Sequence, residues 1–205
     1  KAYTTQLIAL YVFALFVAEQ KKLLSYAEIE HYKNDLLSLA DSVEEVLGCE
    51  SAIKKMSKKL VNQKDMFFLG RGLDYAVAME GSLKLKEISY IHSEPYAGGE
   101  LKHGPIALIE DGTVVVCIST SSDLKPKMDS NIKEVVTRGA YIIGIQTEGF
   151  DTNGFDEMCS IPRVNELFSP VVSVIPLQLL AYYVSIAKGC DVDKPRNLAK
   201  SVTVE

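Results

Sequence analysis

The chain begins with helical patterns of hydrophobic residues. Residues 5–22 form an apolar run, and residues 26–47 place isoleucine, leucine and valine on one side of a helix and charged residues on the other. Gly48 is the expected C-cap of this second helix, and a basic amphipathic helix is predicted over residues 51–62. We therefore expect a helical segment to precede the rest of the fold.

Beyond residue 64 the pattern changes to short apolar runs separated by helical stretches. Such runs are typical of strands in a sheet that is covered on both faces. Strands are predicted over 65–69, 113–118 and 140–145, with a weaker one over 157–161, and helices over 74–90, 124–138 and 170–188. This alternation predicts an α/β fold, a doubly wound parallel sheet flanked by helices. Ligands of such sheets bind beyond the carboxyl ends of the strands, here residues 70–74, 119–123 and 146–151.

Two segments are apolar enough to raise the question of a membrane. Residues 7–18 are shorter than the roughly 20 residues that a membrane-spanning helix needs. Residues 171–187 are longer, but they contain two serines, a proline and a glutamine. Both segments are expected to be buried helices, and no membrane contact is expected.

Composition and charge narrow the possible partners and compartment. The 205 residues are 47% hydrophobic and 24% charged, which is typical of a globular domain. With 22 Lys and Arg against 27 Asp and Glu, the net charge of −5 argues against nucleic acid as a partner. The four cysteines show no paired spacing, which predicts reduced thiols, no metal site and a cytoplasmic protein. The start at Lys1 without methionine suggests a piece of a longer polypeptide.

The predicted helix over residues 74–90 carries charged residues at helical spacing. Glu80, Lys84 and Glu87 fall on one face, while Ser82, Lys86 and Ser89 fall on the opposite one. A surface helix needs only one polar face, so the second could line a cleft or an interface. The simpler explanation, an ordinary ion pair between residues four apart, is the one that spacing alone favours.

Several loop residues are candidates for binding or acid–base chemistry. Residues 70–72 follow a strand and precede a helix, where anions bind, but Gly-Arg-Gly is not a dinucleotide fingerprint. The hydroxyl-rich residues 119–123 suit phosphate binding and helix capping equally well. His103 lies between glycines in an irregular loop and is a candidate acid or base. His31 is expected to face solvent, and His92 to interact with a helix dipole.

The last fifteen residues, 191–205, follow the final helix without periodicity, and Pro195 disfavours a continuous helix. They are either a frayed terminus or an ordered tail that delivers a functional group.

Four segments together resemble the isomerising glutamine–fructose-6-phosphate aminotransferases, the glucosamine-6-phosphate synthase family. The matching segments are residues 1–7, 79–94, 98–105 and 191–205. The resemblance covers essentially the whole chain and is to the C-terminal part of the family's sugar isomerase (SIS) region. It implies an SIS-type sheet over residues 49–190, a helical remnant of the first SIS subdomain over residues 1–48, and a catalytic C-tail over residues 191–205.

The same resemblance implies roles for individual residues. Lys200 matches the lysine that forms an imine with C2 of open-chain fructose 6-phosphate, and Glu87 matches the carboxylate that moves a proton between C1 and C2. Lys84 matches a lysine implicated in handling ammonia. His103 matches the histidine of ring opening, which the family supplies from the neighbouring subunit of a homodimer. These matches favour a catalytic role for Glu87 and Lys84 over an ordinary ion pair.

Three further residues, Arg71, Arg196 and Ala199, are expected on the substrate side of the site. The expected product is glucosamine 6-phosphate. The glutaminase domain and the phosphate-binding loop of the first SIS subdomain would lie upstream, so the 205 residues alone are expected to fold without turnover. The alternative is a sugar-phosphate-binding SIS module that regulates or dimerises; such a module needs no imine-forming lysine.

Overall fold

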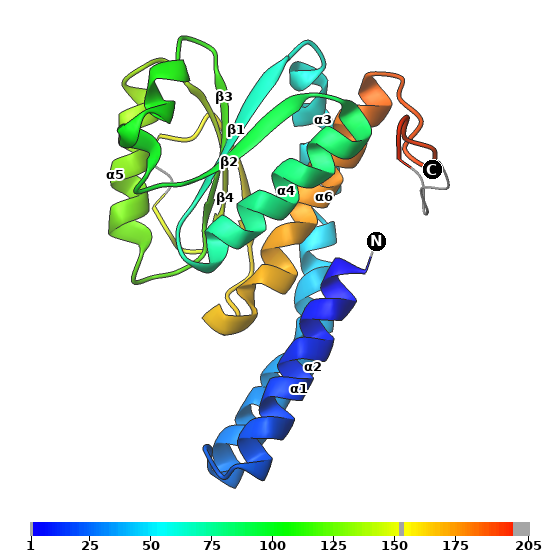
Figure 1. Ribbon diagram of the computed structural model, residues 1–205, viewed down its shortest axis with the longest axis vertical. Helices are drawn as coiled ribbons and strands as arrows, with labels where there is room; N and C mark the ends of the chain where they lie inside the picture. The colour runs from blue at the N-terminus through cyan, green and yellow to red at the C-terminus, as the bar shows by residue number, and fades with distance from the viewer. Residues whose placement is uncertain (1, 152–153, 199–205) are drawn as a thin grey trace, which may run out of the picture.

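A parallel five-stranded sheet forms the centre of the molecule. The computed structural model describes residues 2–151 and 154–198 (Figure 1). The strands lie in the order β2-β1-β3-β4-β5. They are β1 (Asp65–Gly70), β2 (His92–Ala97), β3 (Val114–Ser119), β4 (Tyr141–Thr147) and β5 (Glu157–Ile161). The α/β prediction is thereby confirmed, including the weaker strand at residues 157–161.

Six α-helices accompany the sheet, and their bounds lie within a few residues of those predicted. They are α1 (Tyr3–Gln20), α2 (Tyr26–Leu47), α3 (Glu50–Ser57), α4 (Leu73–Ser89), α5 (Lys125–Val136) and α6 (Ser169–Ala187). Short 3₁₀ turns η1 (Lys58–Leu60), η2 (Leu101–His103), η3 (Pro105–Leu108) and η4 (Glu166–Phe168) complete the described elements. Gly48 does follow α2 as its C-cap, with right-handed backbone.

The helices cover the sheet in two layers. Helices α3, α4 and α6 lie on one face and α5 lies on the other (Figure 1). The larger apolar core lies under α4 and α6, and a smaller one lies under α5. Gly81 lets α4 approach α6 closely, because a Cβ atom there would lie 2.6 Å from Cδ1 of Leu177. This contact fixes α4, which carries the charged face noted above.

The order of the strands creates a reversal between β1 and β3. The chain adds β2 on one side of β1 and then returns to build β3, β4 and β5 on the other side. Strands β1 and β3 are neighbours, and the loops that follow them therefore lead away from each other. In open α/β sheets a crevice for ligands forms at this point.

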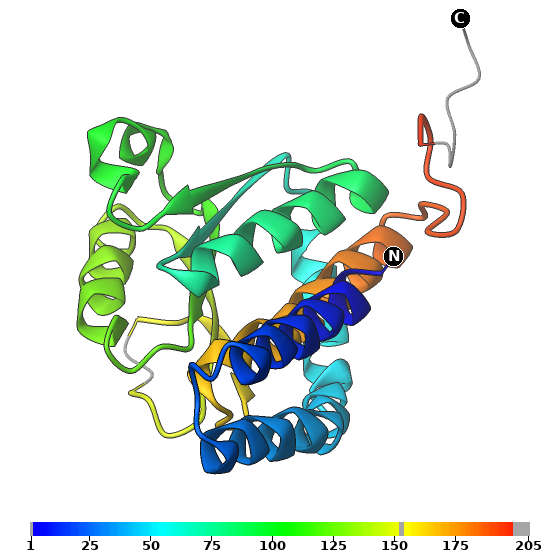
Figure 2. The same ribbon diagram turned by 60° about the horizontal axis from the view of Figure 1, so that its bottom comes forward.

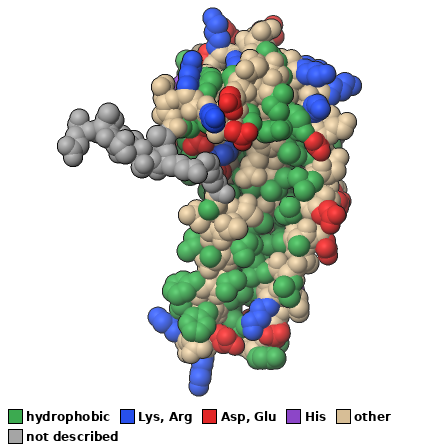
Figure 3. All heavy atoms as spheres, turned by 90° about the vertical axis from the view of Figure 1, so that its right-hand side faces the viewer, with side chains coloured by type: hydrophobic (Ala, Val, Ile, Leu, Met, Phe, Trp, Pro, Cys, Tyr) green, Lys and Arg blue, Asp and Glu red, His purple; other side chains and the backbone are tan. Residues whose placement is uncertain are grey.

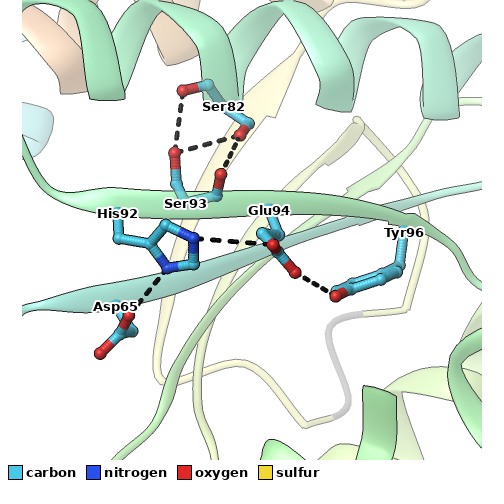
Figure 4. Close-up of polar contacts among 6 residues, drawn as sticks. All are labelled: Asp65, Ser82, His92, Ser93, Glu94 and Tyr96. Carbon is cyan, nitrogen blue, oxygen red and sulfur yellow. Dashed lines mark hydrogen bonds and ion pairs between the residues drawn. The ribbon is translucent and has the colours of Figure 1, made fainter. Parts of the chain in front are cut away.

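Strand β2 was not predicted from the sequence. It is an edge strand with only one buried side chain, Ser93, so it lacks the apolar run that marks the other strands. Pro95 is tolerated because an edge strand leaves backbone groups unpaired. The expectation that His92 interacts with a helix dipole is wrong: His92 begins β2, and its Nδ1 lies 2.8 Å from Oδ1 of Asp65 on β1 (Figure 4).

Helix α1 corrects a second expectation, because it is not a buried helix. It has no buried residue, and Leu10, Phe13 and Phe16 are more than half exposed. It is apolar all round, but only one side contacts α2 and α6, where the Tyr11 ring meets Phe168 edge-on at 4.8 Å. Hydrophobic side chains consequently gather on the surface of the lower, helical part of the molecule (Figure 3).

Helix α6 behaves as predicted for a buried helix. Within the described residues, the segment Glu166–Ala187 is the one helix long and apolar enough to span a membrane, and 72% of its most apolar stretch is buried in the fold. A long apolar helix that is mostly buried in the fold is typical of the core of an α/β domain.

Candidate active site

An open cleft of about 820 Å³ lies on the outer side of α4. Its walls come from α4, α6, the first turn of α1 and the tail after α6, and Figure 2 shows the start of α1 close to the end of α6. The lining includes Ala2 to Thr5, Glu80, Lys84, Glu87, Ile88, Gln178, Val192 to Pro195, and Leu198. Because α4 runs back toward the start of β2, this cleft lies away from the carboxyl ends of the strands. Those ends are where an open α/β sheet usually binds its ligand.

Lys84 sits between two carboxylates on the wall of this cleft. Its Nζ lies 2.7 Å from Oε2 of Glu87 and 3.5 Å from Oε1 of Glu80. The three side chains are only 14–28% exposed. The single face predicted from the spacing therefore exists, and it faces a cleft rather than open solvent.

The surroundings of Lys84 keep its ammonium group charged. Burial lowers its pKa, but the hydrogen bond to Glu87 and the charges of Glu80 and Glu87 outweigh burial, so the pKa is raised above its ordinary value. A protonated amine has no lone pair with which to attack a carbonyl carbon. Lys84 is therefore suited to balancing negative charge or donating hydrogen bonds in the cleft, not to nucleophilic attack.

The opposite side of α4 serves the fold. Ser82 and Ser89 are buried, whereas Lys86 is exposed. The Ser82 hydroxyl donates to the carbonyl of Ser93 at 2.9 Å, and the Ser93 hydroxyl donates back to the carbonyl of Ser82 at 2.9 Å (Figure 4). Ser82 thus attaches α4 to the sheet, while the Ser89 hydroxyl donates to the carbonyl of Leu85 one turn earlier in the same helix at 2.6 Å.

The other face of β2 carries a chain of polar side chains. His92 lies between Asp65 and Glu94, with its Nε2 3.6 Å from Oε1 of Glu94, and the Tyr96 hydroxyl donates to the same carboxylate (Figure 4). The hydrogen bond to Glu94, with some burial, raises the pKa of Tyr96 to about 12. His92 is 64% exposed and borders an open hollow of about 500 Å³ beside the tail. Its contact with Asp65 links the edge strand to β1, in register with the strand pairing.

The first turn of α1 is a part of the site that residue-by-residue reasoning missed. Tyr3 lines the cleft beside Glu80. Burial, followed by the charge of Glu80 and the proximity of Tyr11, raises the pKa of Tyr3 to about 12, so its hydroxyl remains a hydrogen-bond donor at neutral pH. The signal was present, because residues 1–7 carry part of the family resemblance.

The described part of the tail is irregular, as predicted, and is held against α4. The Asp191 carboxylate accepts from the backbone N–H groups of Asp193 (2.9 Å) and Lys194 (3.1 Å). The guanidinium carbon of Arg196 lies 4.1 Å from the centre of the Tyr90 ring, and the backbone N–H of Arg196 donates to the Tyr90 hydroxyl at 2.8 Å. Lys200 and Ala199 lie outside the described residues.

Tyr90 occupies a position where glycine is the usual residue. It ends α4 with left-handed backbone, at φ 61°. The Tyr90 side chain contacts Arg196 through both its ring and its hydroxyl group, and these contacts hold the tail against the end of α4.

Replacing Tyr90 with leucine is expected to loosen the tail. The ring contact and the hydrogen bond together amount to about 1–2 kcal/mol, which is a roughly 5- to 30-fold change in the detached population. Trypsin cleavage after Arg196, followed by mass spectrometry, measures this. Tyr90→Phe keeps the ring and should show a smaller increase in cleavage; equal rates in the leucine variant and the unmodified protein would rule the contact out as a clamp.

His103 and Arg71 are not brought together with Glu87 in one chain. His103 lies in η2, is exposed, and does not line the cleft. Arg71 follows β1, where its Nε donates to Oδ1 of Asn131 at 2.9 Å and the side chain borders a separate hollow of about 240 Å³ at the carboxyl ends of the strands. Among the residues that the structure describes, no three His, Cys, Asp or Glu side chains gather in a way that could hold a metal ion.

Comparison with known proteins gives one consistent result. The family model "SIS domain" matches residues 59–188. The glutamine–fructose-6-phosphate aminotransferases (isomerising) of Clostridium acetobutylicum and Clostridium tetani are 61% and 59% identical to the chain over its whole length. The chain spans only 34% of either relative.

The solved structures agree with this result. The C-terminal domain of glucosamine-fructose-6-phosphate aminotransferase from Francisella tularensis superposes with a TM-score of 0.90 at 39% identity. The match covers 94% of this chain and 55% of that one. Since the family model matches more than half of the sequence and the sheet has the matching fold, the chain belongs to the SIS domain family.

Proposed function

We propose that this chain is the C-terminal isomerase part of an isomerising glutamine–fructose-6-phosphate aminotransferase. Its substrate is then fructose 6-phosphate, and its product is glucosamine 6-phosphate. Similarity along the full length of the chain supports the assignment. The observation that carries it is Lys84 held between Glu80 and Glu87 on the wall of the cleft, because isomerisation needs a carboxylate beside the sugar's reacting carbons.

The proposed chemistry divides between Glu87 and the tail. The amine of Lys200 adds to C2 of the open-chain ketose and water leaves, which forms an imine. Ammonia then displaces the lysine from C2. The Glu87 carboxylate takes a proton from C1 and returns it to C2, while the proton of the C1 hydroxyl passes to the nitrogen on C2. This leaves an aldehyde at C1 and an amine at C2. The balance is one sugar phosphate and one ammonia giving one amino sugar phosphate and one water.

The raised pKa of Lys84 supports the assignment of the imine to a different lysine, Lys200. The raised pKa leaves the Lys84 amine protonated, which suits it to guiding ammonia or stabilising negative charge rather than attacking C2. Leu198, two residues before Lys200 in the sequence, lines the cleft. For Arg196 and Ala199 we propose substrate contacts from this same tail. Arg71 borders a different hollow, so its proposed substrate contact rests on the resemblance alone.

Hydrogen exchange at C1 distinguishes an isomerase from a binding module. An intact aminotransferase that carries this chain as its C-terminal third is incubated in deuterium oxide with fructose 6-phosphate and no glutamine. Deuterium should enter C1, as followed by NMR, because without ammonia the lysine imine stays at C2 and activates the C1 protons for removal by Glu87. Tight binding of fructose 6-phosphate without exchange would contradict catalysis and favour a regulatory sugar-phosphate module.

We further propose a homodimer in which His103 serves the partner subunit's cleft. Support comes from its exposure and from its absence among the residues lining its own cleft. Intact chains carrying His103→Ala and Lys200→Ala, each inactive alone, should recover activity when mixed, because one cleft of the heterodimer regains both residues. Absence of recovery in a heterodimer shown to form would count against the shared site.

The remaining proposals concern the whole protein. We propose that residues 1–48 end the first SIS subdomain, that residues 49–190 form the second, and that residues 191–205 are the catalytic tail. A glutaminase domain supplies ammonia in the intact enzyme. We place the protein in the cytoplasm, supported by the free thiols of its four cysteines, two of them buried.

A further inference from the structure

The crevice between β1 and β3 is the place where a doubly wound sheet ordinarily takes its ligand. Residues 120–123 follow β3 there and carry four hydroxyl or carboxyl side chains. They lead into α5, whose N-cap, Leu124, makes no side-chain hydrogen bond. The hydroxyl groups of the loop are thus not used to cap the helix, which was one of the two explanations open from the sequence.

The donors of this loop instead converge on Glu166, which begins η4. The backbone N–H and the hydroxyl of Ser122 both donate to Oε1 of Glu166, at 2.7 and 2.6 Å. The Ser121 hydroxyl donates to Oε2 at 3.1 Å. One carboxylate therefore receives three hydrogen bonds from adjacent loop residues, in the way that such a loop would surround a phosphate oxygen.

A second carboxylate lies behind the first. Asp74, buried at the start of α4, accepts from the backbone N–H of Thr120 at 2.8 Å and from the Thr120 hydroxyl at 2.6 Å. Burial raises the pKa of Asp74, against the effect of the Thr120 bonds. At Glu166 the hydrogen bonds from Ser122 have the largest effect, and they lower the pKa of the carboxyl group. Glu166 therefore supplies a negative charge at the loop.

We propose that Glu166 is a built-in anion that occupies the phosphate-type loop of this sheet and excludes phosphate groups from it. Next to Glu166 the crevice keeps a hollow of about 240 Å³, whose lining includes Arg71, Gly72 and the buried Asp74. Removing the Glu166 side chain would therefore free the Ser121 and Ser122 donors, enlarge the hollow and leave an arginine at its edge. Glu166 thus determines that this SIS sheet does not take a sugar phosphate at its own crevice.

The test is phosphate binding by the 205-residue protein carrying Glu166→Ala. Thermal unfolding is followed while inorganic phosphate is titrated at ionic strength held constant with chloride. The variant should be stabilised saturably, by roughly 3–6 °C at ten times the dissociation constant. The amide resonances of Ser121 and Ser122 should shift with the same midpoint. The unmodified protein and Glu110→Ala, which removes an exposed carboxylate elsewhere, should show neither effect.

Two results would overturn the proposal. One is a folded Glu166→Ala protein that phosphate neither stabilises nor shifts at Ser121 and Ser122. The other is the unmodified protein responding to phosphate at those amides as strongly as the variant does. If the variant does not fold in chloride, it is refolded from denaturant in phosphate and in chloride: recovery in phosphate alone supports the proposal, and failure in both contradicts it.

Discussion

Replacing Glu87 with glutamine is expected to slow deuterium exchange at C1 of fructose 6-phosphate by roughly 10²- to 10⁴-fold, the usual contribution of a positioned acid or base. Glutamine keeps the shape of the side chain and an oxygen that can accept from Lys84, which lies 2.7 Å away in the unmodified protein. The amide cannot take a proton from carbon. The loss should therefore appear in the exchange rate far more than in the affinity for the sugar phosphate.

Glu80→Gln is the matched control for this experiment. It removes the same charge from the same face of α4, beside the same lysine, at a Lys84 distance of 3.5 Å. If Glu87 is the proton carrier, Glu80→Gln should lower exchange less than tenfold. Equal losses in the two variants would mean that the cleft needs negative charge near Lys84 rather than a base at one position, and full exchange in Glu87→Gln would remove Glu87 from the mechanism.

Replacing Lys200 with alanine is expected to lower the exchange at least as much, by roughly 10²- to 10⁴-fold or more. Without the imine, C1 lies next to an unactivated ketone, whose neighbouring protons are harder to remove. Among the described residues that line the cleft, Lys84 and Lys194 are the lysines. The neighbouring carboxylates raise the pKa of Lys84, so its amine is less readily deprotonated for attack on C2. Lys194→Ala is therefore the matched control, and it should exchange normally.

The sheet could be predicted from sequence wherever burial on both faces gives a strand a continuous apolar run. Strands β1, β3 and β4 have such runs, and all were predicted. Strand β2 lies at the edge and reads His-Ser-Glu-Pro-Tyr-Ala, so nothing in its composition separates it from a loop. The length of each apolar helix could also be predicted, but whether the helix is buried could not. Helices α1 and α6 are both strongly apolar, yet of the two only α6 lies in the core.

The candidate site shows the same division between local and long-range information. Helical spacing placed Glu80, Lys84 and Glu87 on one face because that relation is set within one element. The partner of Ser82 comes from the sheet, so the sequence could not tell this buried serine from a surface one. The bond between Ser122 and Glu166 joins residues 44 positions apart, and no periodic pattern reveals it.

The most direct test of the central claim is to trap the imine in an intact aminotransferase that carries this chain. Sodium borohydride reduces an imine to a stable secondary amine, so treatment in the presence of fructose 6-phosphate attaches the sugar to whichever lysine forms the bond. Peptide mass spectrometry should place one sugar phosphate on Lys200, and Lys200→Ala should abolish the label. A label on Lys84 or Lys194, or trapping that survives in Lys200→Ala, would contradict the account.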